Sequence, residues 1–195
     1  MVTLSKALPL ILDHTYFEKI HSIKSSFIRL FSHLGNRLSS LDLERVHRVY
    51  KGIKITKGNE LRHCPYQVLD LVRDFDKNNG FNIRVLHWWG RGMFVIIYFG
   101  QENPCLVDSH LLPGYFKEKN YRLGCTASPW DYGGMIDEAK TADFIDGPML
   151  AAHQQKFRHI QLIRKIEYET EYALMEETLY EELSTICQLF IKDSG

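Results

Sequence analysis

Three polar residues near the middle of the chain have the clearest potential for acid–base chemistry. His87 lies in an alternating segment typical of a β-strand, and Asp108 and His110 are two residues apart. In an extended segment this spacing places both side chains on the same face. A histidine beside a carboxylate is the minimum for general acid–base catalysis. His87, Asp108 and His110 are therefore candidate catalytic residues, while the alternative is a half-buried strand histidine and an ordinary turn.

Cys64 is a second candidate because it directly precedes Pro65, where the sequence predicts the first turn of a helix. The partial positive charge at a helix N-terminus favours the nucleophilic thiolate. His63 adjoins Cys64, but neighbouring residues in a chain seldom face each other, so His63 would be a poor base. The alternative is a cysteine that only packs.

Aromatic side chains in two segments could bind a ligand or a partner. They occur in a glycine-flanked loop over 128–134 and at the tip of a predicted hairpin. Together with one neighbouring arginine, the candidate ligand-binding residues are Trp88, Trp89, Arg91, Trp130 and Tyr132. Large rigid rings provide contact area at low entropic cost. The same rings could instead cap the core, and their types alone do not decide between these roles.

No metal or cofactor is expected from the motifs. Glu18 and His21 have the Glu-x-x-His spacing of dinuclear iron sites, with His14 one turn earlier, but the complete ligand set of such a site is not evident in the sequence. The sequence also lacks a Walker-type loop, a dinucleotide-binding glycine pattern, a GxSxG elbow and an HExxH pair. Solvated helix charge explains the polar residues near the N-terminus better than a metal site does.

Hydrophobic periodicity predicts the elements that must position these residues. Helices are predicted over 15–34, 41–48 and 65–75 and again from about residue 148, and strands over 49–56 and 105–108. The strongest pattern is a hairpin over 81–99, in which Gly90-Arg91-Gly92 supplies a tight turn. The order of elements predicts an α+β fold: an antiparallel sheet built around this hairpin, with helices packed on one face and a long acidic C-terminal helical segment.

Two segments are ambiguous. Residues 109–135 have no clear period, which indicates either a functional loop or hidden short strands. Residues 166–172 alternate as a strand would, whereas the helical patterns on either side favour a helix or a break between two helices.

The distribution of charge predicts how the two ends of the chain interact. The 195 residues fit a single domain, and 24 basic residues balance 24 acidic ones. However, residues 1–92 contain 15 Lys plus Arg and 8 Asp plus Glu, whereas residues 166–195 contain 1 and 8. The segment 148–192 should therefore dock on the basic part of its own chain or of another copy. We expect it to build a homo-oligomer.

The composition also restricts partners and location. The neutral total charge disfavours nucleic acid, although a basic surface could be formed by Lys51, Lys54, Lys57, Arg62, Arg84 and Arg91. The sequence has no stretch that suits a signal peptide or a membrane span, since the apolar run over 7–12 is short and contains Pro9. Four scattered cysteines without a CxxC pattern indicate reduced thiols in the cytoplasm.

Together these patterns favour a non-enzymatic, cytoplasmic, oligomeric domain. It would bind a small ligand or a protein partner through the central hairpin and the Trp130 loop. The alternative is a hydrolase or transferase that uses His87 with Asp108 or His110, or the Cys64 thiol. Convergence of the polar candidates in one cleft would favour the enzyme.

Overall fold

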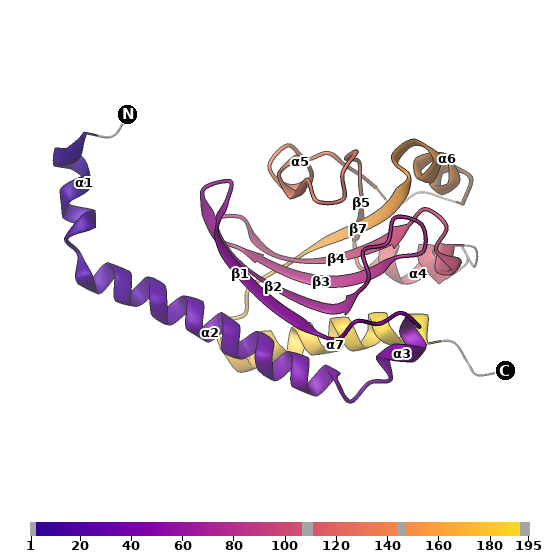
Figure 1. The fold of residues 1–195 in the computed structure, drawn as a ribbon, viewed down its shortest axis with the longest axis horizontal. Coiled ribbons are helices and arrows are strands. Elements are labelled where there is room, and N and C mark those ends of the chain that lie inside the picture. The colour runs from indigo at the N-terminus through magenta and orange to yellow at the C-terminus, as the bar shows by residue number, and fades with distance from the viewer. Residues whose placement is uncertain (1–2, 107–110, 144–146, 192–195) are drawn as a thin grey trace.

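A seven-stranded antiparallel sheet is the centre of the computed structural model, which describes residues 3–106, 111–143 and 147–191 (Figure 1). This confirms the predicted α+β fold with an antiparallel sheet and a C-terminal helix. In their order across the sheet, the strands are β1 (Lys54–Leu61), β2 (Cys64–Arg73), β3 (Phe81–Trp88), β4 (Gly92–Gly100), β7 (His159–Ile166), β5 (Arg122–Gly124) and β6 (Thr141–Asp143).

Two long helices, α2 (His14–Leu38) and α7 (Tyr172–Phe190), lie side by side beneath one face of the sheet (Figure 1). The short helix α5 (Tyr132–Ile136) packs on the other face. No helix among the described residues has the length and apolar character needed to cross a membrane. The remaining helical elements are α1 (Leu4–Ile11), α3 (Leu43–Val46), η1 (Pro104–Leu106), α4 (Leu111–Glu118) and α6 (Gly147–Phe157).

The predicted hairpin over 81–99 is confirmed as β3 and β4, with Val85 opposite Val95 in the register. Its alternation separates two apolar clusters, as expected for a strand buried on both faces. Ile83 and Val85 belong to the larger cluster, which includes α2 and α7, whereas Leu86 and Trp88 belong to a smaller one with α5. The hairpin therefore forms the middle layer of the molecule.

The helix predicted over 65–75 is wrong, because these residues form most of strand β2. Val68, Leu69, Leu71 and Val72 are all buried, so both faces of the strand are apolar. Apolar residues on both faces of a strand produce helical three- and four-residue spacings by chance, and periodicity cannot distinguish the two structures. Cys64 consequently lies at the start of a strand and not at a helix N-terminus.

The last part of the chain also differs from the prediction. The segment 148–192 is not helical throughout: α6 ends at Phe157, and β7 follows, paired between β4 and β5. Residues 167–171 form neither helix nor strand and lead into α7. The ambiguous segment 166–172 is thus a connection between a strand and a helix. Ile160 and Ile163 have helical spacing in the sequence, but they lie on opposite faces of β7, which is buried on both faces.

Three further segments have element boundaries that differ from the prediction. The first strand runs over 54–61 and not 49–56. The strand expected over 105–108 begins in the 3₁₀ helix η1, and its residues 107–108 lie outside the described residues. Within 109–135, the structure reveals the short strand β5 together with α4 and α5.

The acidic C-terminal helix docks on the basic part of its own chain. Arg37 of α2 bonds to Glu176 at 3.1 Å and Glu177 at 2.9 Å, and its guanidinium lies 3.9 Å from the centre of the Tyr180 ring. The apolar stripe of α7 is buried in the larger core through Met175, Leu179, Leu183, Ile186 and Phe190. Because its own sheet covers this stripe, α7 does not need a second copy for that purpose.

Candidate binding site at the hairpin end of the sheet

A groove of about 490 Å³ opens between α2, the tip of the β3–β4 hairpin and the connection from β7 to α7. His87 lies in its wall, with its ring centre 3.8 Å from that of Phe27. Tyr168 contributes an edge contact to His87 at 5.8 Å, and Trp89 lies 6.1 Å away. We refer to this feature as the aromatic groove. It brings together two of the predicted site residues, His87 and Trp89.

The electrostatics of the groove favour a neutral His87. Burial lowers the pKa of its imidazole to about 4, so the ring is uncharged at neutral pH. Its Nδ1 is 2.8 Å from Oε1 of Gln67, which also accepts a hydrogen bond from Nε1 of Trp89 at 3.0 Å. Among the described residues no carboxylate is hydrogen-bonded to the His87 ring. An uncharged ring among aromatic neighbours suits an apolar occupant.

The other catalytic candidates do not join His87 in the described structure. Asp108 and His110 lie outside the described residues. Cys64 follows the tight Arg62-His63 turn between β1 and β2, where both turn residues have positive φ, 44° and 65°. Its sulfur accepts a hydrogen bond from Nη1 of Arg91 at 2.9 Å.

Trp88, Arg91 and Tyr132 connect the opposite face of the sheet to α5. Trp88 is fully buried and donates from Nε1 to the Leu61 carbonyl at 2.9 Å. The Arg91 guanidinium lies 4.7 Å from the centre of the Trp88 ring and bonds to both carboxylate oxygens of Asp137. Tyr132 is buried, and its hydroxyl accepts a hydrogen bond from Arg84. These residues therefore contact their own chain and lie away from the groove.

Trp130 occupies a third place, at the other end of the sheet. It is 43% exposed, and its ring meets the edge of Phe75 at 5.0 Å and lies 6.0 Å from Tyr98. The Arg84 guanidinium lies 5.5 Å from the centre of the Trp130 ring. The predicted ligand-binding residues therefore lie in three places: the aromatic groove, the smaller apolar cluster with α5, and the surroundings of Trp130.

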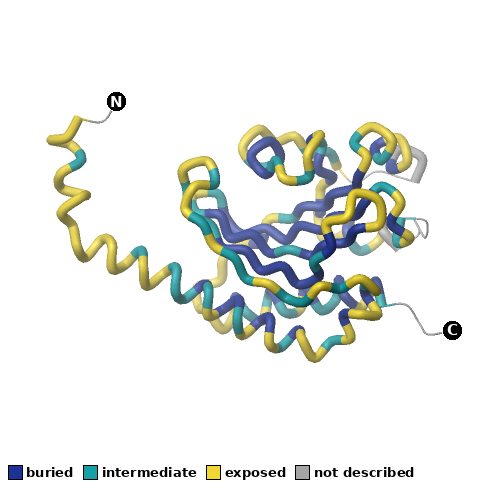
Figure 2. Tube along the Cα trace, viewed as in Figure 1, coloured by how far each residue is buried: buried dark blue, intermediate teal, exposed yellow. Residues whose placement is uncertain are grey.

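An exposed apolar arm, which the sequence-based prediction missed, extends from the groove. The arm consists of α1 and residues 14–26 of α2, and α1 with the first turns of α2 projects beyond the sheet (Figures 1 and 2). None of its residues is buried, whereas Phe27, Leu30, Phe31, Leu34 and Leu38 of the same helix are. Tyr16, Phe17 and Ile23 continue the buried stripe of α2 into solvent. In the sequence, the apolar run over 7–12 is the signal of this arm.

Comparisons of this chain with protein-family models, curated proteins and solved structures find no match. The chemistry of the molecule's own surfaces therefore has to carry the functional inference. The fold and the groove define an α+β architecture with an aromatic groove next to an exposed apolar helix.

Proposed function

We propose that this protein is a non-enzymatic interaction domain in which the arm of one copy binds the aromatic groove of a second copy. The observation that carries this proposal is the uncovered continuation of the apolar stripe of α2. The sheet covers the stripe from Phe27 to Leu38, but not from Tyr16 to Ile23. In folded proteins a large exposed apolar patch marks an interaction surface.

A symmetric pairing of two arms would cover these surfaces. If two arms pack against each other near Tyr16, α1 of each copy, which is bent away from the axis of α2 (Figure 1), lies over the aromatic groove of the other. Ile23 and Phe27 line the aromatic groove. Such an interface is isologous, which is the commonest arrangement in soluble homo-oligomers. The leucines of α1 would then have apolar partners on both sides.

The charges at the groove favour this occupant. Glu169 and Glu171 line the groove and are exposed, whereas on the arm Lys6, Lys19 and Lys24 outnumber Asp13 and Glu18. An arm entering the groove of a second copy brings these lysines toward the glutamates. Charge complementarity of this kind fixes the orientation of partners more than it adds affinity.

Introducing charge on the arm should abolish self-association. We expect the native chain to sediment as a dimer and the double variant Leu8→Asp, Phe17→Asp to sediment as a monomer, because an aspartate buried at an apolar interface is strongly unfavourable. The melting temperature at high dilution should not change, since Leu8 and Phe17 are exposed within one copy. The measurement is sedimentation velocity over a range of concentrations.

Ser22→Asp is the matched control, because Ser22 is exposed on the opposite side of α2 and should leave the dimer intact. A native chain that remains monomeric at high concentration contradicts the proposal. So does a dimer that the double variant leaves unchanged. Binding of the monomer to lipid vesicles, lost in the same variant, would assign the arm to a membrane surface instead.

A cytoplasmic location belongs to the same proposal. None of the four cysteines forms a disulfide, and Cys187 is buried in the core. Thiols that stay reduced in a stable fold are typical of a reducing compartment.

A further inference from the structure

A second cavity, of about 530 Å³, lies at the end of the sheet opposite to the aromatic groove. Its walls come from the turn between β2 and β3, the end of β4, the loop over 127–130 and the start of β7. We call it the Trp130 cavity. The groove and the cavity share no residue, so a ligand here would be independent of self-association.

Aromatic rings form one side of the Trp130 cavity. Phe75, Tyr98 and Trp130 line it, and the Tyr98 ring lies 6.0 Å from both Trp130 and His159. Phe75 and Trp130 are partly exposed, 37% and 43%. Accessible aromatic faces of this kind stack on planar rings, and nucleic-acid bases are well suited to them.

A buried nitrogen in the cavity wall lacks a hydrogen-bond partner. His159 is only 3% exposed, and its Nε2 is one of the few buried side-chain atoms in the described part of the chain without a partner. The ring is hydrogen-bonded to the Phe157 backbone, and burial lowers its pKa, so it is neutral. With Nδ1 donating to that carbonyl, Nε2 is left as an acceptor. It is therefore suited to an N–H donor on a ligand.

Cations and amides make up the rest of the lining. Lys77 and Arg158 are exposed where the cavity meets solvent, and Asn78 and Gln101 add amide groups. No acidic residue is among the described residues that line it. This composition favours an anionic group at the mouth, and a phosphate satisfies two such cations well.

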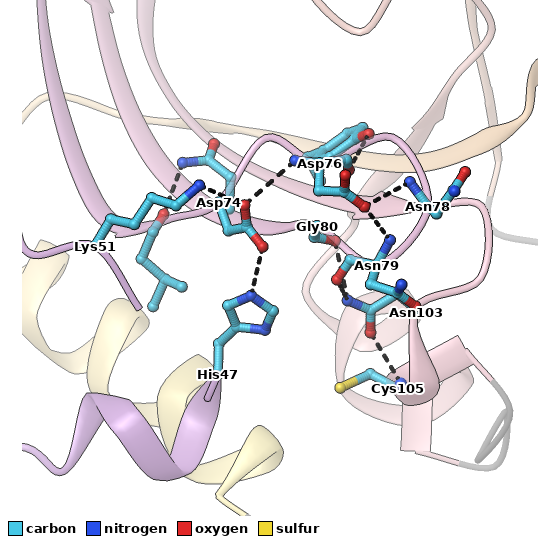
Figure 3. Close-up of polar contacts among 12 residues, drawn as sticks. His47, Lys51, Asp74, Asp76, Asn78, Asn79, Gly80, Asn103 and Cys105 are labelled. Carbon is cyan, nitrogen blue, oxygen red and sulfur yellow. Dashed lines mark hydrogen bonds and ion pairs between the residues drawn. The ribbon is translucent and has the colours of Figure 1, made fainter. Parts of the chain in front are cut away.

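The turn that carries Phe75, Lys77 and Asn78 is held rigidly (Figure 3). On one side, Asp74 bonds to Nε2 of His47 at 2.9 Å and to Nζ of Lys51 at 3.1 Å. Asp76 caps the turn by accepting hydrogen bonds from the backbone N–H groups of residues 78 and 79, at 2.9 and 2.7 Å. Residues on such a turn are preorganised, so little entropy is lost when a ligand binds.

From these contacts we infer that the Trp130 cavity binds a nucleoside monophosphate whose base carries an amino group. The base stacks on the exposed ring of Trp130, its amino group donates to Nε2 of His159, and the phosphate lies between Lys77 and Arg158. Adenosine monophosphate combines these three features, so it is the probe with which to test the site. This site goes beyond the proposed self-association, which uses the other end of the sheet.

Isothermal titration of the full chain with adenosine monophosphate tests this inference. We expect saturable one-to-one binding with a sub-millimolar Kd. Purine riboside 5′-monophosphate, which lacks the amino group, and the His159→Phe variant should each bind about tenfold more weakly, since one buried hydrogen bond is lost. Adenosine and inorganic phosphate should each bind at least about tenfold more weakly, because adenosine lacks the phosphate and inorganic phosphate lacks the nucleoside.

Arg158→Ala keeps the test decisive if His159→Phe folds poorly, because Arg158 is exposed and its loss should weaken the nucleotide without changing the melting temperature. Arg29→Ala, an exposed arginine on α2, is the matched control and should bind normally. No saturable binding at millimolar nucleotide overturns the inference. Binding that survives both Arg158→Ala and His159→Phe overturns it too, and adenosine binding as tightly as the nucleotide removes the phosphate subsite.

Discussion

Replacing Glu182 with alanine should lower the free energy of unfolding by about 3–5 kcal/mol, which is the cost of breaking a buried charge pair. Glu182 lies on α7 and is buried against the sheet. Its carboxylate accepts hydrogen bonds from the hydroxyls of Tyr121 at 2.6 Å and Tyr115 at 3.1 Å, and it pairs with Nη1 of Arg164 at 2.5 Å. The variant leaves these three donors without their common acceptor.

Chemical denaturation at pH 7 measures this loss. Arg164 is about a quarter exposed, so water can partly solvate it and the loss should lie toward the lower end of the range. Glu182→Gln retains an acceptor and should lose less. Glu181→Ala, at the exposed neighbouring position, is the control and should change stability by about 0.5 kcal/mol or less. A Glu182→Ala variant as stable as this control would show that the cluster does not anchor α7.

Acidification should destabilise the fold through His87. Burial holds the pKa of His87 at about 4 in the folded chain, below its ordinary value of 6.5. As the pH falls below 6.5, the unfolded chain binds a proton that the folded chain excludes, so unfolding becomes easier. The contribution of His87 is fully present above pH 6.5 and is lost progressively down to pH 4, by roughly 3 kcal/mol.

The variant His87→Phe isolates this effect. Phenylalanine keeps an aromatic ring against Phe27, and Gln67 keeps its hydrogen bond from Trp89. Burial also lowers the pKa values of His153 and His159, so the native chain and the variant should both lose stability in acid. Urea denaturation from pH 7 to pH 4 measures the free energy of unfolding of both chains, and the difference between them is the contribution of His87. If the free energy of unfolding depends on pH equally in both chains, His87 is not a buried, neutral residue.

Local patterns were sufficient where one structural period dominated a segment. The alternation over 81–89, followed by two glycines and an apolar return, determined the β3–β4 hairpin and which residues share a face. Likewise, the helical spacing before residue 34 predicted most of α2. The charge distribution predicted that the acidic C-terminal segment docks on the basic part of its own chain or of another copy, and the structure shows the first of these. These features follow from geometry within one element or from net charge, both of which the sequence contains directly.

The candidate sites required the tertiary structure. Phe27, His87 and Tyr168 meet in the groove although sixty or more residues separate each from the next. His159, in turn, lies in a strand that the sequence presented as helix, so its position in the Trp130 cavity could not be anticipated.

The sequence by itself determined an antiparallel α+β fold with a central hairpin and an acidic C-terminal helix. Only the tertiary structure decided that β2 and β7 are strands, that the arm is uncovered, and which aromatic rings remain accessible. The physical reason for β2 and β7 is burial on two faces: when packing covers both sides of a strand, apolar residues occupy both faces and the two-residue period weakens. Likewise, whether an apolar stripe is covered depends on where the sheet ends, and no local pattern records that.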